Sequence, residues 1–176
     1  MADDFFLKIM GIEGESQDAR HKGEITLDTW SFGGSAEEMV GGMVGGKPSG
    51  PTRPGVVNGR FNAQDFQFTA KVSKASPKLF EACTTGMRLR DVILFARRAG
   101  TEQQDYLRIR LSDVLVASYQ LSGSSGTGDV PVDQVSCSFA RIEIEYKEQR
   151  LDGSLGGSVT AMVDLNKNRP TRKKSR

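Results

Sequence analysis

Alternation of apolar and polar residues is the feature that most restricts what this chain can fold into. Between Leu107 and Leu111 every second residue is apolar, which is typical of a strand with one buried and one solvent-facing side. After Leu111 the apolar positions move by one residue, so that Val114 and Val116 fall out of phase. A change of phase indicates a β-bulge, or a strand that leaves one core to cover another surface.

The same change of phase occurs in two other places. It separates residues 25–27 from 30–32, and residues 135–139 from 142–146. Long strands with bends allow a sheet to curl back on itself. The sequence therefore predicts a mainly β fold, a closed or sharply bent antiparallel β-barrel rather than a flat sheet. Further candidate strands span residues 5–10, 65–72, 88–98 and 158–165.

One short helix is predicted to flank the barrel. Ser76 suits the helix N-cap, Pro77 suits the first helical position, and Gly86 suits the left-handed residue that ends a helix. A helix of about ten residues is marginal alone, so it must pack on an open end of the barrel. Its expected apolar face consists of Leu79, Phe80 and Cys83.

Segments rich in glycine and proline mark the connections. Residues 33–59 contain three prolines and several paired glycines, and we expect an extended flexible loop there. The run Ser-Gly-Ser-Ser-Gly-Thr-Gly at 122–128 is typical of a flexible connection between strands. The length of 176 residues fits one domain, for which we expect the bounds 1–165, followed by a basic, disordered tail at 166–176.

The net charge of +2 comes from the tail. Six of the 24 basic residues follow Leu165, so 18 basic and 22 acidic residues remain in 1–165, a net charge of −4. The tail has no interleaved aromatic residues, and we expect no nucleic-acid partner. The chain has no apolar run long enough to span a bilayer, and we expect no membrane insertion.

Candidate catalytic residues are few. His21 is the only histidine and lies in a polar stretch, where we expect a structural or solvent-exposed role. Glu143 and Glu145 share one strand face, which we expect to be the solvent-facing side of that strand. Such a pair also suits acid and base chemistry, as in a glycosidase, but nothing supplies a substrate cleft. We expect no enzyme.

No cofactor or metal site is predicted. Cys83 and Cys137 are far apart and form no C-x-x-C pair, so free buried thiols are favoured over a metal site, although a disulfide remains open. The glycines at 41–46 are not followed by Gly-Lys-Ser/Thr and lie in no strand-turn-helix context. This excludes a phosphate-binding loop of the known types.

Apolar residues on parts of both strand faces indicate that another chain covers one of them. A heterologous interface that closes by rotation gives a ring, and rings that stack give a tube. A monomeric barrel that carries a small apolar ligand is the alternative. The mass of the particle in solution distinguishes these two hypotheses.

Several spaced blocks of residues, in order, resemble one known family, the hemolysin-coregulated protein (Hcp) family, which forms the inner tube of bacterial type VI secretion systems. The resemblance covers roughly residues 5–165. Its blocks are Phe-Phe-Leu-Lys-Ile-Met-Gly-Ile-Glu-Gly-Glu-Ser at 5–16, His21, Gly-Glu-Ile at 23–25, Trp-Ser-Phe-Gly at 30–33, Asp65-Phe66 with Phe68-Thr69, Lys-Ala-Ser-Pro-Lys-Leu at 74–79, Val-Leu-Val at 114–116 with Ser118-Tyr119, Val-Asp-Gln-Val-Ser at 132–136, and Ile-Glu-Ile-Glu-Tyr at 142–146.

This resemblance implies a barrel subunit that forms hexameric rings, which stack into a tube related to phage tail tubes. It implies spike, sheath and effector proteins as partners, with effectors carried in the lumen. It also implies synthesis in the bacterial cytoplasm and export by sheath contraction into the medium or a target cell. The acidic start of the chain, which lacks a Sec-type signal, agrees with that route.

Two groups of residues are candidates for contacts in such a tube. The first group supplies apolar side chains in the long loop and is predicted to stack rings. It consists of Met39, Val40, Met43, Val44, Val56 and Val57. The second group lies on polar strand faces and is predicted to line the lumen or to contact a neighbouring subunit. It consists of Thr29, Ser31, Arg108 and Arg110.

Overall fold

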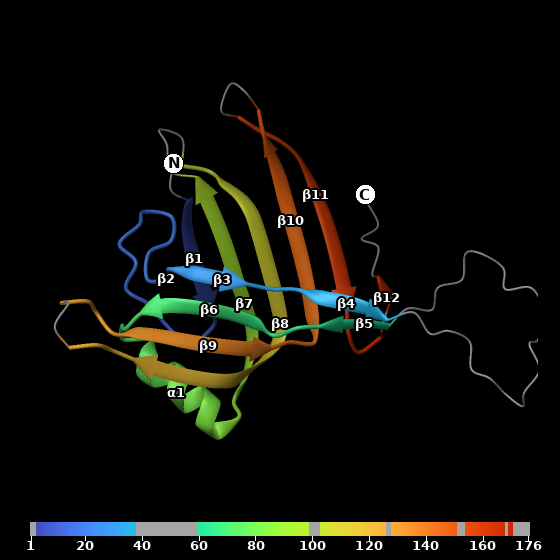
Figure 1. The fold of residues 1–176 in the computed structure, drawn as a ribbon. Helices are drawn as coiled ribbons and strands as arrows, with labels where there is room; N and C mark the ends of the chain where they lie inside the picture. Colours follow the sequence, from blue (N-terminus) through green and yellow to red (C-terminus); the bar gives the residue numbers. More distant parts are fainter. Residues whose placement is uncertain are drawn as a thin grey trace, which may run out of the picture.

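Long antiparallel strands build most of the chain (Figure 1). The computed structural model describes residues 3–37, 60–98, 103–125, 128–150, 154–167 and 169–170. The elements in chain order are β1 (Asp3–Ile9), β2 (Ile25–Leu27), β3 (Thr29–Ser31), β4 (Gly34–Glu37), β5 (Arg60–Ala63), β6 (Phe66–Lys71), α1 (Ser76–Thr85), β7 (Arg88–Arg98), β8 (Asp105–Ser122), β9 (Val132–Ser138), β10 (Arg141–Gln149), β11 (Leu155–Asp164) and β12 (Arg169–Pro170).

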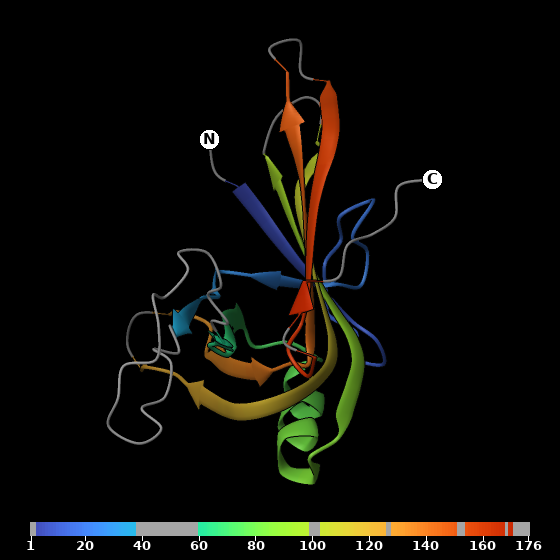
Figure 2. The ribbon, with the colours of Figure 1, turned by 90° about the vertical axis from the view of Figure 1, so that its right-hand side faces the viewer.

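Strand β8 joins two parts of one large sheet. Its first half pairs with β7 and β10, in a row of strands ordered β12-β11-β10-β8-β7-β1-β2. Its second half pairs with β9, and β9 continues the sheet through β6 to β3. In Figure 2 the strands of the first part stand upright, and the second part crosses below them. The sheet is therefore sharply folded along β8.

The bend in β8 lies where the sequence changes phase. Asp113 has a φ of 56°, and it interrupts the pairing of β8 with β7 between Ser112 and Val114. Aspartate tolerates this left-handed conformation better than most residues. Leu111 and Val114 lie three positions apart on either side of this interruption, and both are buried in the core. The predicted bend within a long strand is confirmed here.

The other two changes of phase lie at breaks between strands. Asp28 separates β2, which pairs with β1, from β3, which pairs with β6. A backbone hydrogen bond of 2.8 Å from Asp28 N–H to the Thr69 carbonyl connects the two regions. Among the strands that the structure describes, no ladder joins β2 to β6. The strands β1, β2, β3, β6, β9, β8 and β7 therefore form a closed circuit, a sharply bent barrel. Between β2 and β3 this circuit is completed by the backbone at Asp28, and not by a hydrogen-bonded ladder.

Large apolar side chains fill the inside of this circuit. Leu7, Phe66, Leu94 and Leu111 are each no more than 1% exposed. Burial of one such side chain stabilises a fold by roughly 1.5–3 kcal/mol. Helix α1 packs against β8 and contributes Leu79 and Ala82 to the same core. The packed interior disfavours the hypothesis of a carrier for a small apolar ligand.

Two details of the predicted helix are wrong. Its N-cap is Ala75, and Ser76 lies inside the first turn because its hydroxyl donates a hydrogen bond to buried Asp133 instead of capping. Phe80 is 55% exposed and leans on Tyr119, with ring centroids 5.7 Å apart. The predicted end is confirmed, since Gly86 has a φ of 66°.

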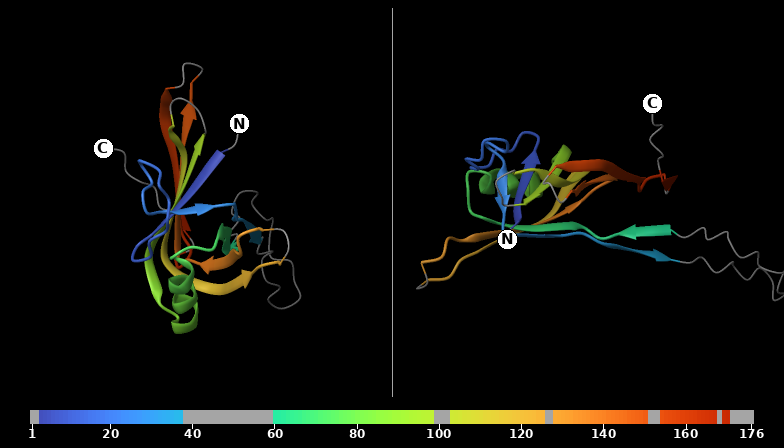
Figure 3. Two further views of the ribbon diagram at one scale, coloured as in Figure 1. Left: turned by 90° about the vertical axis from the view of Figure 1, so that its left-hand side faces the viewer. Right: turned by 90° about the horizontal axis from the view of Figure 1, so that it is seen from above.

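Short strands occupy parts of the predicted loop and tail. Within the expected loop 33–59, residues Gly34–Glu37 pair with Arg60–Ala63 as a two-stranded ribbon that projects from the body (Figure 3). Within the expected tail, Arg169–Pro170 pair with Val163 and Asp164. Gly33, Asn166 and Lys167 are also described, and the remaining residues of both segments lie outside the described part of the chain. The six loop residues predicted to stack rings are among them: Met39, Val40, Met43, Val44, Val56 and Val57.

In the described part of the chain, no helix has the length and apolar character that crossing a bilayer requires.

Candidate assembly surfaces

Two rows of uncharged polar side chains cross the second part of the sheet. The cross-strand register places Thr29 beside Thr69, and Ser31 beside Gln67, and it extends both rows through β9 to β8. Neighbouring hydroxyls are hydrogen-bonded, with Thr29 Oγ1 2.7 Å from Thr69 Oγ1. We call this the uncharged face. Its members are Thr29, Ser31, Gln67, Thr69, Ser118, Gln120, Gln134 and Ser136.

A charged face covers the other part of the sheet. Arg110 Nε lies 3.1 Å from Asp91 Oδ1, and this hydrogen bond lowers the pKa of Asp91. Arg108 Nη2 lies 2.6 Å from Glu145 Oε2 and 3.7 Å from Glu143 Oε1. The guanidinium thus occupies the space between the two carboxylates. This arrangement disfavours the glycosidase hypothesis, because a substrate would have to displace an ion pair.

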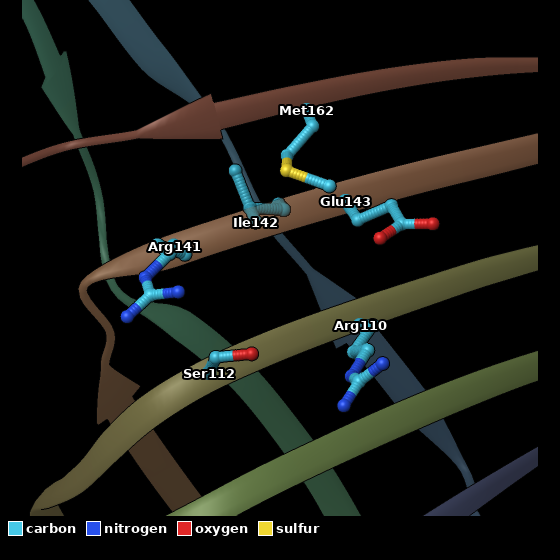
Figure 4. Close-up of a pocket in the computed structure, with 6 residues that line it drawn as sticks. All are labelled: Arg110, Ser112, Arg141, Ile142, Glu143 and Met162. Atoms are coloured by element: carbon cyan, nitrogen blue, oxygen red, sulfur yellow. The ribbon is translucent and has the colours of Figure 1, made fainter. Parts of the chain in front are cut away.

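A depression of about 190 Å³ interrupts the charged face. Figure 4 shows it between β8 and β10, with Arg110, Arg141 and Glu143 along it. Met162 of β11 borders its other side. Three of its six lining residues are charged, and it is half-open, so it lacks the mainly apolar, enclosed walls that are typical of a small-molecule site.

The four polar residues predicted for the lumen or a subunit contact lie on two different faces. Thr29 and Ser31 belong to the uncharged face, whereas Arg108 and Arg110 belong to the charged face. The sequence signal could not separate them, because each alternates with apolar residues in the same way. The remaining members of the uncharged face were missed, although Gln67 and Thr69 show the same alternation.

The β10–β11 hairpin carries the apolar face of the sheet beyond the core. Across the register Ile142 pairs with Val163, and Tyr146 pairs with Val159. Exposure increases outward along the hairpin: Ile142 is 4% exposed, Tyr146 is 46% exposed and Val159 is 72% exposed. In Figure 2 the hairpin stands free of the helix and of the second part of the sheet. We call Ile144, Tyr146, Val159 and Ala161 the arm face.

His21 lies inside the protein, not on a loop surface. The residue is 3% exposed, and its ring stacks on Phe6 with centroids 4.5 Å apart. Nδ1 lies 2.8 Å from Glu24 Oε2, and Nε2 lies 3.0 Å from Asp105 Oδ1. Of the two roles predicted for this residue, the structural one fits and the solvent-exposed one is wrong.

Both cysteines are free thiols. Cys137 is buried, and burial raises its pKa to about 12, so the inert thiol form predominates. Cys83 is half-buried on α1. Among the described residues, no group of three histidine, cysteine or acidic side chains is placed to hold a metal ion.

Comparison with known proteins agrees with this architecture. The family model described as "Type VI secretion system effector, Hcp" matches residues 6–146. Protein hcp1 of Pseudomonas aeruginosa is 37% identical over 158 residues, which are 89% of this chain and 91% of that protein.

Solved structures show the same fold. Hcp1 from Salmonella typhimurium has a TM-score of 0.75 at 30% identity, over 97% of this chain and 100% of that one. A structure described as a type six secretion system protein has a TM-score of 0.83 at 24% identity, over 97% of this chain and 100% of that one. The predicted fold class is therefore confirmed, and the chain belongs to the Hcp family of type VI secretion proteins.

Proposed function

We propose that this chain is the structural subunit of a type VI secretion inner tube. In this proposal six copies close a ring and rings stack into a tube. Contraction of a sheath exports the tube from the cytoplasm of the bacterium that makes it, and effectors travel in its lumen. The family of secreted tube proteins to which the chain belongs supports this reading. The subunit itself carries out no reaction, and its partners are copies of itself and the spike, sheath and effector proteins.

Ring closure rests on the arm face, which is the observation that carries the proposal. A valine that is 72% exposed beside a tyrosine that is 46% exposed extends an otherwise buried sheet face into solvent. An apolar patch continuous with a core is typical of a subunit interface. A second copy that covers this patch at one side of each subunit gives the heterologous contact that a ring requires.

The uncharged face suits the wall of the lumen. Its hydroxyl and amide groups both donate and accept hydrogen bonds, so they can contact varied protein surfaces. Fixed charges would instead retain cargo of opposite sign and repel cargo of like sign. The charged face, where Arg108 and Arg110 lie, then faces away from the lumen. This assigns Thr29 and Ser31 to the lumen.

Stacking of rings is assigned to the 40–59 loop on its sequence alone. Its methionines and valines supply adaptable apolar contacts between rings. Deletion of residues 41–55 is expected to leave single rings and to abolish tubes in negative-stain images. Tubes of ordinary length from the shortened chain would exclude this role.

Val159→Asp tests ring closure. A carboxylate at this exposed position of the arm face would be buried without a partner in the ring, so we expect particles of one subunit mass by light scattering. The matched control is Ser158→Asp, one residue away on the opposite side of β11 and beside Lys147, which should retain rings with a central hole. Intact rings from Val159→Asp would exclude the arm face as the ring interface.

A further inference from the structure

The environment of His21 contains one acceptor too many. Its two ring nitrogens face two carboxylates, Glu24 at 2.8 Å and Asp105 at 3.0 Å. A neutral imidazole has a single N–H and donates to only one of them. Its other nitrogen would then direct a lone pair at a carboxylate oxygen. The cluster satisfies both contacts only if it holds one more proton than a neutral ring and two carboxylates.

The surroundings keep this proton away from water. Phe6 of β1 stacks on the ring, and Phe95 of β7 lies at 4.9 Å between centroids. The side chain of His21 is 4% exposed and that of Glu24 is 11% exposed, whereas that of Asp105 is 30% exposed. Burial also raises the pKa of Glu24. The three groups lie close enough together to share one proton.

Other charges around the cluster are already paired or lie at its edge. Asp18 accepts the backbone N–H of His21 and is bound by Arg97 of β7, with Nη1 2.9 Å from Oδ1. Asp4 of β1 lies 4.0 Å from the same guanidinium. Lys8 of β1 favours the charged form of Glu24, but less strongly than burial opposes it.

The cluster fastens the segment 13–24 to the rest of the fold. This segment connects β1 with β2, and it carries both His21 and Glu24. Asp105 is the first residue of β8 and lies 84 positions after His21 in the sequence. A second link joins Arg20 Nη1 to the Gln103 carbonyl at 2.7 Å. The groups that share a proton thus hold segment 13–24 at the start of β8, while the Asp18–Arg97 ion pair ties the same segment to β7.

We propose that His21, Glu24 and Asp105 form a proton-dependent clasp, which holds segment 13–24 against β8 and opens when the shared proton leaves. Because proton binding is linked to folding, the affinity of the clasp for its proton determines how the free energy of unfolding changes with pH. A free histidine titrates near 6.5, so the folded clasp gains stability when it keeps its proton above that pH. This stability is complete below about pH 6.5 and is lost as the pH rises through the value at which the clasp releases the proton.

Nitrogen-15 NMR of the histidine-labelled full chain tests the proton count, since a single histidine needs no assignment. At pH 7 we expect both ring nitrogens to be protonated. Asp105→Asn is expected to lower the midpoint of proton loss by about one pH unit, a tenfold weaker proton affinity. The control Asp129→Asn, at an exposed site, should leave it unchanged. A single N–H at pH 7, or a midpoint unmoved in Asp105→Asn, would overturn the proposal.

Limited trypsin digestion tests opening of the clasp, because Arg20 and Lys22 lie in the segment and are exposed. Between pH 7 and pH 9, cleavage there is expected to accelerate at least fivefold relative to cleavage after exposed Lys78 of α1. His21→Gln should be cut rapidly at both values. Equal protection of the segment at pH 7 and pH 9 would contradict a proton-dependent clasp. Neither readout depends on whether the chain forms rings.

Discussion

Asp133 shows how one buried side chain fixes several elements. It lies on β9, is 1% exposed, and accepts hydrogen bonds from Ser76 of α1 and from Tyr119 of β8. Burial, together with the hydrogen bond to Asp133, raises the pKa of Tyr119 to about 12, so this donor keeps its proton at all ordinary pH values. A buried carboxylate is tolerated only when such donors satisfy it. Helix α1 is therefore positioned by a polar contact as well as by its apolar face.

Asp133→Ala is expected to destabilise the fold by about 3 kcal/mol, because the hydroxyls of buried Ser76 and half-buried Tyr119 lose their acceptor and a cavity remains. The measurement is urea unfolding followed by circular dichroism. Asp129→Ala, at an exposed position before β9, is the control and should have little effect. If Asp133→Ala lowered the free energy of unfolding as little as the control does, water would have replaced the carboxylate as the acceptor.

The ion pair of Asp18 with Arg97 is expected to make stability depend on pH in the acid range. The hydrogen bond from Arg97 holds the pKa of Asp18 well below its usual range. Asp18→Asn should therefore lower the free energy of unfolding by about 3 kcal/mol at pH 7, since buried Arg97 then keeps only Asp4, at 4.0 Å, as a carboxylate partner. This difference from the unmodified chain should persist down to about pH 4 and shrink as the pH falls further.

Unfolding by urea at pH 7, 4 and 3 measures this dependence. Asp113→Asn is the matched control, because it removes a carboxylate from an exposed pair with Arg88 and retains a residue that tolerates the left-handed backbone. It should change stability much less. If Asp18→Asn lowered the free energy of unfolding equally at pH 7 and pH 3, the lowered pKa of Asp18 would not be the cause of the pH dependence.

At the scale of elements, alternation predicts where the strands lie and where they bend. The candidate strand 88–98 coincides with β7, and the change of phase after Leu111 coincides with the left-handed Asp113. Both signals are local, because they follow from which side of a strand each residue faces. The same local signal marked residues 25–32, where the structure has two strands separated by Asp28.

What alternation could not predict depends on which strands become neighbours. The uncharged face exists only because β3, β6, β9 and β8 lie side by side, and their sequence positions are far apart. His21 was misjudged for the same reason: its partner Asp105 and the covering ring of Phe95 come from distant strands. A polar stretch of sequence does not show that a β7–β8 hairpin will cover it.

Gly14 is predicted to be indispensable to the β1–β2 connection. A Cβ at this position would lie 2.3 Å from the Glu24 carbonyl oxygen and 2.6 Å from the Ile25 nitrogen, both backbone atoms. Gly14→Ala should therefore destabilise the protein by about 2 kcal/mol or more, seen as a lower melting temperature. Gly157→Ala on β11 is the control, because nothing lies within 4 Å of its added carbon. Equal melting temperatures would contradict the close approach.

For the whole molecule, stability and assembly are expected to be linked. If the ring buries the arm face, association favours the folded chain by mass action, and the melting temperature should rise with protein concentration. Val159→Asp should remove that dependence, while Ser158→Asp should retain it. Calorimetry over a hundredfold range of concentration measures the effect. A melting temperature independent of concentration in the unmodified chain would indicate that rings add nothing to stability.

Strand β8 also has a mechanical consequence for the proposed tube. Its 18 residues, at about 3.3 Å each, make one continuous backbone roughly 60 Å long. The outer hairpin β10–β11 is hydrogen-bonded to its first half, and the strands of the uncharged face follow from its second half. In the tube that we propose, a push on the outside of a subunit would be transmitted along this covalent connection to the uncharged face. We therefore expect the two parts of the sheet to advance together under axial thrust in that tube.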